Sequence, residues 1–160
     1  MTRGVKHPDP EAALAASEAL YRATFDQAAL GIAHVGLDGR WLRVNDRLCA
    51  ITGYSRAELL GRHFADITHP DDLPANLAYV DAVREGRAPT YTMEKRYRRR
   101  DHTLVWVKLA VSVLRGPTGQ PKHFISTVDD ISDRKRAEAA LHANEQLLRQ
   151  ALDGLPEIAW

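Results

Sequence analysis

The sequence of 160 residues is poor in cysteine and in long apolar segments. Cys49 is the single cysteine, which excludes an intramolecular disulfide framework and a Cys-x-x-Cys zinc site, and which is typical of a reducing compartment. No apolar run approaches the roughly 20 residues that cross a bilayer, and the segment after Met1 lacks the apolar stretch of a signal peptide. We therefore expect a cytoplasmic segment without direct membrane contact, although a longer parent protein could carry an anchor elsewhere.

The sequence also lacks an excess of charge of one sign, with 22 Lys and Arg residues, 21 Asp and Glu residues and a net charge of +1. Such a chain has no general attraction to nucleic acid or to an anionic membrane. Residues 94–100 form the one dense basic run, and their alternation on a predicted strand favours a solvated strand end. We therefore expect no nucleic-acid partner.

Sequence motifs of catalysis are missing as well. The sequence contains no HExxH, GxGxxG or phosphate-loop pattern, and no Ser, His and Asp in a hydrolase order. Asp129 and Asp130 are adjacent on a predicted strand, where neighbouring side chains face opposite ways and cannot easily share a metal ion. We expect neither an enzymatic activity nor a metal site in this segment.

The composition that is present, 44% hydrophobic and 27% charged, is that of a globular domain. Two β-prone segments, residues 31–35 and 41–45, flank an Asp38-Gly39 pair, which predicts a hairpin. Residues 46–67 predict brief helices, one of which begins at a capping box formed by Ser55 and Glu58. A longer helix is predicted over residues 71–85.

Three longer strands are predicted in the second half of the sequence. Residues 91–98 alternate with a period of two, and so do residues 122–128 after a Gly116-Pro117 turn. The central strand is the clearest, because its apolar residues share one face: Val105, Val107, Leu109, Val111 and Val113. These elements predict an antiparallel α+β domain of roughly 110 residues.

Residues 11–25 and 132–153 predict helices that flank this domain. The second helix has two competing heptad registers on one broad face, and an amphipathic helix that lies on its own domain is an open alternative to a coiled coil. On the sheet, Leu104 and Trp106 are apolar on the outward face, so we expect a flanking helix or a second subunit to cover them. The predicted dimer interface consists of Leu20, Trp106, Leu141, Asn144 and Leu148.

Several local stretches follow one another in the order and spacing of a known family: Gly31-Ile32, Asp38-Gly39-Arg40, Val44-Asn45, residues 52–61, His69-Pro70-Asp71-Asp72, Trp106 and Asp130-Ile131-Ser132. Over about residues 21–136, these stretches and the order of the predicted elements resemble a PAS domain followed by its C-terminal PAC motif. One departure is Asp101-His102, where the family usually has Asp-Gly, so His102 must adopt a turn conformation that glycine takes more readily.

The resemblance implies a five-stranded antiparallel sheet with short helices over one face, a small cavity, dimerisation through flanking helices and an output domain after the C-terminal helix. We expect a sensory and dimerisation module, or a ligandless scaffold for dimerisation or protein–protein contact. The expected parent is a larger signalling protein, first a sensor histidine kinase, with a diguanylate cyclase or phosphodiesterase as alternatives. The expected parts are a disordered tail (1–10), a helix (11–25), the PAS core (26–131), a signalling helix (132–153) and the start of a further domain (154–160).

Flavin and haem, two cofactors of the family, are not expected. The flavin photosensors of this family need a reactive cysteine on the short helix after Gly61-Arg62, where the aligned position is Phe64. Haem-binding members usually take an axial histidine from the long helix, and residues 71–85 contain none. The identity of any cofactor stays unknown, and none is expected to bind tightly.

The resemblance places Ile32 on the cavity side of its strand, and His34 shares that side. His34 could anchor a small ligand, or it could be a core histidine that the hydroxyl of Tyr91 or Ser126 satisfies. A lining of bulky aliphatic residues favours either a small apolar ligand or a filled cavity. The predicted lining residues are Ile32, His34, Phe64, Leu77, Leu109, Ser126 and Val128.

The resemblance also implies where the signal would leave the core. In the family, the position of Asp130 often pairs with a basic residue and couples the last strand to the helix, and Arg134 is within reach for that role. We therefore predict that Asp130, Ile131, Ser132 and Arg134 relay the signal.

Overall fold

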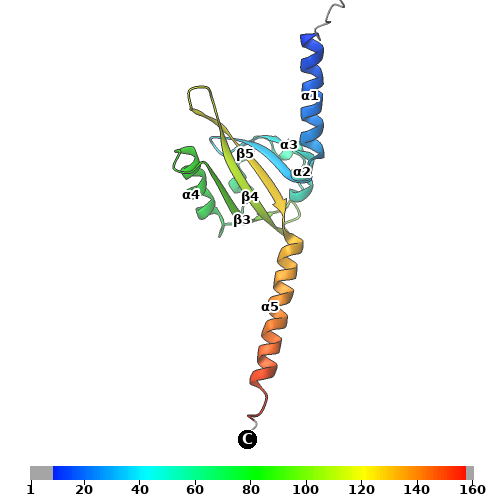
Figure 1. Ribbon diagram of the computed structural model, residues 1–160, viewed down its shortest axis with the longest axis vertical. Coiled ribbons are helices and arrows are strands. Elements are labelled where there is room, and N and C mark those ends of the chain that lie inside the picture. Colours follow the sequence, from blue (N-terminus) through cyan, green and yellow to red (C-terminus); the bar gives the residue numbers. More distant parts are fainter. Residues whose placement is uncertain (1–8, 158–160) are drawn as a thin grey trace, which may run out of the picture.

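The computed structural model describes residues 9–157 and contains one antiparallel sheet of five strands. The strands lie in the order β2-β1-β5-β4-β3 (Figure 1), so the last strand in the chain pairs with the first. Their bounds are β1 Gly31–Gly36, β2 Trp41–Val44, β3 Thr90–Arg98, β4 Leu104–Arg115 and β5 Pro121–Asp130. This arrangement confirms the predicted α+β fold.

Four short helices pack on one face of the sheet and enclose the apolar core with it. The capping box of Ser55 and Glu58 begins the second of them, as predicted. The face of β4 that carries Val105, Val107 and Val111 is buried against these helices. The helices are α2 Asp46–Thr52, α3 Arg56–Leu59, the 3-10 helix η1 Phe64–Ile67 and α4 Leu73–Arg84.

Two turns have the conformations that their residues predict. Gly39 in the β1–β2 hairpin has a φ of 87°, in the left-handed region where glycine has no steric penalty. His102, between β3 and β4, has a φ of 68° and is the one non-glycine residue with positive φ in the described part of the chain. The expectation that His102 replaces a turn glycine is confirmed.

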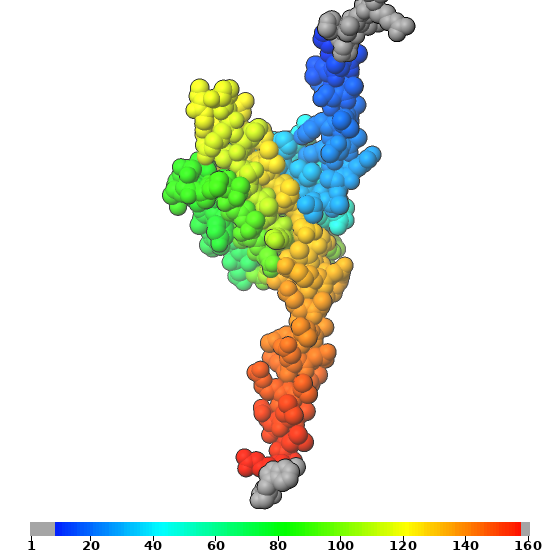
Figure 2. Space-filling model, viewed as in Figure 1, coloured from blue at the N-terminus to red at the C-terminus, as the bar shows by residue number. Residues whose placement is uncertain are grey.

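The two flanking helices are α1 Pro10–Gln27 and α5 Ser132–Asp153, and they leave the domain at opposite ends (Figure 1). Both stand clear of it for most of their length, as Figure 2 shows. Phe25 is the one buried residue of α1, and α5 has none. The alternative that the C-terminal helix lies on its own domain is therefore wrong.

Several sequence predictions concern residues near the ends of the chain. The predicted tail, residues 1–10, lies largely outside the described residues, and α1 already begins at Pro10. Of the predicted further domain, residues 154–157 are described and 158–160 are not. No helix within residues 9–157 combines the length and the apolar character needed to span a membrane.

Candidate functional site: the cavity and the two helix junctions

A small cavity lies between the sheet and its helical cover. It leaves about 30 Å³ for the centres of water-sized molecules, which is room for roughly two waters. Most of its wall is apolar, and the polar side chains on it come from α4, β3 and β5. The lining residues are Val35, Trp41, Phe64, Asn76, Val80, Tyr91, Lys95, Tyr97, Leu109, Val111, Phe124 and Ser126.

Lys95 on β3 is the charged residue in this wall, and its side chain is only 1% exposed. Its Nζ donates hydrogen bonds to Asn76 Oδ1 at 2.6 Å and to Thr68 Oγ1 at 3.1 Å. The same atom lies 4.6 Å from the ring centroid of Tyr97 and 5.2 Å from that of Phe64, within the range of cation–π attraction. Burial lowers the pKa of Lys95 to about 7.

A short chain of hydrogen bonds continues from Lys95 along the cavity. Asn76 on α4 accepts from Lys95 and donates through Nδ2 to the Tyr91 hydroxyl at 3.1 Å. Burial raises the pKa of Tyr91 to about 12, so this hydroxyl stays protonated. The cavity therefore has one polar end, at which an ammonium, an amide and a phenol meet.

Some of the residues predicted to line the cavity do so and others do not. Phe64, Leu109 and Ser126 are on its wall. Val128 is buried in the core beside Gly31 of β1 rather than on this wall, and a side-chain carbon on Gly31 would lie 3.2 Å from its Cβ. Leu77 is 41% exposed, because Asn76 rather than Leu77 occupies the inward position of α4. The prediction of Leu77 and Val128 as lining residues is wrong.

The prediction that Ile32 and His34 face the cavity is also wrong, since both lie on the opposite face of β1. The core face of β1 carries the small residues Gly31 and Ala33, because α2 packs so close that a side-chain carbon on Gly31 would lie 3.2 Å from Leu48. At the start of β1, the larger side chains Ile32 and His34 therefore point outward, although Val35 further along the strand faces the core.

His34 instead joins the outer face of the sheet to α1. Its Nε2 shares a hydrogen bond of 3.2 Å with the Tyr21 hydroxyl, and its Nδ1 shares one of 3.1 Å with His123 Nε2. Burial, together with the charges of His123 and Arg43, lowers the pKa of His34. Tyr91 and Ser126, the hydroxyls expected to satisfy His34, line the cavity on the other face.

Lys95 itself was missed in the sequence because it lies within a charged run. Lys95 lies on the same face of β3 as Tyr91 and Tyr97, both of which are buried. A lysine on the apolar side of an alternating strand is the signal that could have identified it. The interpretation of this run as a solvated strand end therefore fails at Lys95.

Asn45 organises the junction between α1 and the core. Its side chain is fully buried, and Oδ1 accepts from the backbone N–H groups of Ile32 at 2.9 Å and Leu48 at 3.0 Å. Its Nδ2 donates to the carbonyls of Phe25 at 2.8 Å and Leu30 at 3.0 Å. Each atom of the amide thus has two partners, and the end of α1 is fixed to β1 and α2.

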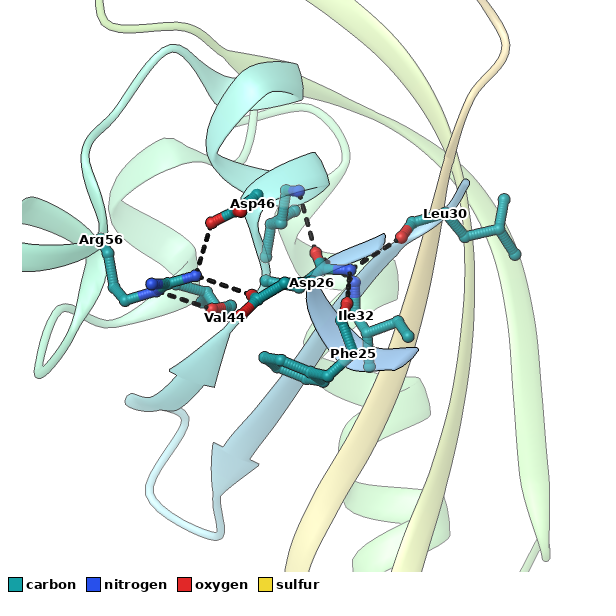
Figure 3. Close-up of polar contacts among 9 residues, drawn as sticks. Phe25, Asp26, Leu30, Ile32, Val44, Asp46 and Arg56 are labelled. Atoms are coloured by element: carbon teal, nitrogen blue, oxygen red, sulfur yellow. Dashed lines mark hydrogen bonds and ion pairs between the residues drawn. The ribbon is translucent and has the colours of Figure 1, made fainter. Parts of the chain in front are cut away.

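Arg56 reinforces the same junction from α3. Its Nε donates to the Val44 carbonyl at 3.1 Å, and its Nη2 lies 2.9 Å from Asp26 and 2.7 Å from Asp46 (Figure 3). Asp26 belongs to α1 and Asp46 to α2. One guanidinium therefore ties three helices together.

Asp130 and Ser132 form the junction between β5 and α5. Asp130 Oδ1 accepts from the Ser132 N–H at 2.9 Å, and its Oδ2 lies 3.9 Å from Arg99. Burial raises the pKa of Asp130, but hydrogen bonding by Ser132 and the charge of Arg99 outweigh it and hold that pKa below the usual range. The prediction that Arg134 pairs with Asp130 is wrong, because Arg134 pairs with Glu94.

Glu94 on β3 holds the first turn of α5. It pairs with Arg134 and lies 2.9 Å from Lys135 Nζ, and hydrogen bonds from Lys135 and Arg134 lower its pKa. Lys135 Nζ also lies 4.5 Å from the ring centroid of Trp106, and the Ile131 N–H donates to the Trp106 carbonyl at 3.0 Å. The first turn of α5, residues 132–135, which we call its root, thus covers Trp106, as expected of a flanking helix.

The other residues of the predicted dimer interface are unburied in the single chain. Leu20, Leu141 and Leu148 are exposed by 70%, 61% and 62%, and Asn144 is exposed too. Leu104, expected to be covered with Trp106, is 50% exposed. The described residues contain no group of three or more His, Cys, Asp or Glu side chains placed to hold a metal ion.

The strand order and the helical cover on one face are those of the PAS fold. The family model described as "PAS fold" matches residues 42–128, and the chain belongs to this family. It is a PAS domain of the kind found in sensor proteins.

Individual relatives place the chain among signalling proteins. It is 41% identical over 134 residues to the "Probable diguanylate cyclase DgcE" of Escherichia coli (strain K12), which covers 84% of this chain and 12% of that protein. It is 26% identical over 138 residues to the "Sensor histidine kinase TmoS" of Ectopseudomonas mendocina, covering 86% and 14%. The chain therefore spans about one eighth of the length of these relatives.

A solved structure shows the same fold at a comparable level of sequence identity. The "Sensory Box Histidine Kinase/Response Regulator" from Burkholderia thailandensis E264 superposes with a TM-score of 0.64 at 28% identity. The match covers 81% of this chain and 98% of that chain.

Proposed function

We propose that this PAS domain is a sensory and dimerisation module that relays a change at its cavity to an output domain through α5. The observation that carries the proposal is the arrangement of two adjacent residues on β3. Lys95 points into the cavity, and Glu94 points outward to Arg134 and Lys135 on the first turn of α5. A displacement of this strand at the cavity therefore acts directly on the helix root.

Homodimerisation through the flanking helices is the second part of the proposal. Exposed leucines recur along both helices, and a free helix with a charged surface and an apolar stripe gains stability by pairing. Two copies of α5 would bury Leu141 and Leu148, with Asn144 at or beside the seam. A ligandless scaffold for dimerisation is the alternative, and it would keep the dimer without the response at the cavity.

The output domain is proposed from the relatives. A diguanylate cyclase is favoured by the 41% identity to the Escherichia coli protein, and a histidine kinase is supported by the relative from Ectopseudomonas mendocina. We place the module in the cytoplasm and expect neither flavin nor haem. A visible absorption spectrum of the purified protein tests the cofactor proposal, since either group would give strong bands.

The relay is tested by amide hydrogen exchange at residues 132–136. Replacing Lys95 by Met should change the exchange there although residue 95 faces the cavity, because it shifts the strand that holds Glu94. The matched control is Arg98→Met, at an exposed position of the same strand. Equal exchange in the wild type and in Lys95→Met would refute the relay.

The dimer is tested by the mass of the chain in solution. We expect a dimer that the double variant Leu141→Asp and Leu148→Asp dissociates, because two charges at the seam repel their copies. Ala139→Asp with Gln146→Asp places the same charges on the opposite side of α5 and should leave the dimer intact. A monomeric wild-type chain would overturn this part of the proposal.

A further inference from the structure

The Lys95 ammonium is a buried cation without an anionic partner. Its two hydrogen-bond acceptors, Asn76 Oδ1 and Thr68 Oγ1, are both neutral. Among the described residues, no carboxylate lies within 4.0 Å of Lys95 Nζ. Asp72 is the carboxylate whose charge acts on Lys95 from a distance, and its own oxygens accept hydrogen bonds from Arg96. The third ammonium proton thus has no oxygen acceptor among residues 9–157.

A lysine in this condition is uncommon, since lysines are almost never fully buried unless they are paired. Aromatic rings offset part of the lost hydration, and Tyr97 and Phe64 both lie close to Nζ. The remainder would be offset by an anion, because charge-assisted hydrogen bonds are about twice as strong as neutral ones. A negative group is therefore the kind of partner that the polar end of the cavity favours.

The rest of the cavity restricts what that group can be attached to. Val80, Val111 and Phe124 make its wall apolar away from Lys95. The space, about 30 Å³ for the centres of water-sized molecules, holds only a small molecule unless side chains move. A single cationic end and a remainder that is apolar except for Ser126 suit a molecule with one charged head and a short hydrocarbon tail.

We propose that the cavity binds a short-chain carboxylic acid in its ionised form, whose carboxylate accepts a hydrogen bond from Lys95 Nζ. This inference rests on the proposed sensory function in that it names the ligand class of the same cavity. The carboxylate would complete the hydrogen bonding of the ammonium, and the tail would lie against the apolar wall. Binding changes the environment of Lys95, and Glu94, the next residue on β3, holds α5.

The proposal is tested with three sodium salts, acetate, propionate and butyrate, and with the corresponding amides acetamide, propionamide and butyramide. Each amide has the shape of its acid without the charge. Binding is followed at constant ionic strength, below the pKa of Lys95, by the backbone amide resonances of β3, β4 and β5. In chains that keep Lys95, the nitrogen and proton resonances of its side chain are followed as well. We expect at least one carboxylate to shift these resonances saturably and to bind about tenfold or more tightly than its amide.

Two variants assign the effect to Lys95. Lys95→Met should abolish carboxylate binding, while Lys108→Met, an exposed lysine on the outer face of β4, should leave it unchanged. Equal affinity for acid and amide, a shift that never saturates, or binding that survives in Lys95→Met would overturn the proposal. The wild-type titration keeps it testable even where Lys95→Met does not fold.

The same samples separate this inference from the proposed relay. Carboxylate binding with unchanged amide exchange at residues 132–136 would support the ligand and refute the relay. Altered exchange in Lys95→Met without any carboxylate binding would support the relay and refute the ligand.

Discussion

Asn45 and Lys95 are both buried polar side chains, yet the regions around them are built in opposite ways. The Asn45 amide is uncharged and makes four hydrogen bonds to backbone groups of α1, β1, α2 and the loop between α1 and β1. The Lys95 ammonium makes two, both to side chains, and faces a cavity. A buried polar group whose hydrogen bonds are all made within the protein fixes the structure around it. A buried polar group that has an unused donor can bind a ligand.

The comparison predicts which flanking helix is fixed and which can move. α1 is joined to the core by the saturated contacts of Asn45 and by Arg56. α5 is joined by pairs between half-exposed charged groups, Glu94 with Arg134 and Lys135. Exposed ion pairs contribute little to stability and exchange partners readily. The N-terminal junction therefore behaves as an anchor and the C-terminal junction as an adjustable contact.

The largest effect is expected from Asn45→Ala. This replacement leaves two buried N–H groups and two carbonyls without the hydrogen bonds that Asn45 makes, so the free energy of unfolding should fall by about 3 kcal/mol or more. Urea denaturation measures this loss. Asn144→Ala, the same replacement on the exposed surface of α5, is the control and should leave the domain's free energy of unfolding almost unchanged. A small loss in Asn45→Ala would mean that water replaces the amide and that α1 is not anchored by it.

The second effect is a rise of stability with pH. The pKa of Lys95 is lowered to about 7 in the folded chain, so in alkaline solution the unfolded chain binds more protons. From about pH 7 to 9 the free energy of unfolding should rise by roughly 2 kcal/mol, since each unit is worth about 1.4 kcal/mol. Above the ordinary tyrosine pKa the trend reverses, because burial raises the pKa values of Tyr91 and Tyr97.

Urea denaturation at several pH values measures this slope. Asp72, Tyr91 and Tyr97 are the titratable groups whose charges or side chains face Lys95. Lys95→Met removes the titrating group and should flatten the profile in the same interval. A wild-type profile that is already flat would contradict the assignment of a lowered pKa to Lys95.

The third effect is the small cost of removing the charge. Lys95→Met should change the free energy of unfolding near neutral pH by no more than about 1 kcal/mol in either direction, because lost hydrogen bonds are offset by the relief of burying a cation. Measured beside Asn45→Ala, it separates the two regions. A loss as large as that of Asn45→Ala would make Lys95 a structural clamp and remove the distinction.

The smallest effect is expected at the root of α5. Glu94→Gln keeps the size of the side chain but removes its charge, so amide exchange at residues 132–136 should speed up by roughly twofold to fivefold. Exchange at the C-terminal end of α1 should not change. Adding salt to the wild type should act in the same direction. If both helices respond alike, the two junctions do not differ as proposed.

Periodic and capping patterns predicted most of the fold. The alternation of Val105 to Val113 identified the core face of β4, and the bounds of α5 agree with the predicted residues 132–153. These patterns predict the fold because the residue type at each position depends on whether that position is buried or exposed. The site was harder, since a residue's role there depends on contacts distant in sequence.

Particular residues show where the pattern fails. The family resemblance placed Ile32, and with it His34, on the cavity side of β1, but the close packing of α2 requires Gly31 and Ala33 on that face. The partner of Arg134 depends on the distance between α5 and β3, for which the sequence has no local signal.

The length of α5 has a consequence for what kind of information can leave the domain. Its 22 residues extend about 33 Å at 1.5 Å per residue, several times the Debye length of about 8 Å at physiological salt. The electrostatic potential of a charge at Lys95 is therefore almost fully screened at the far end of the helix. The helix acts as a rigid lever, and only its tilt or rotation reaches that end. Any ligand that displaces the first turn of α5 by the same amount therefore produces the same signal at the far end of the helix.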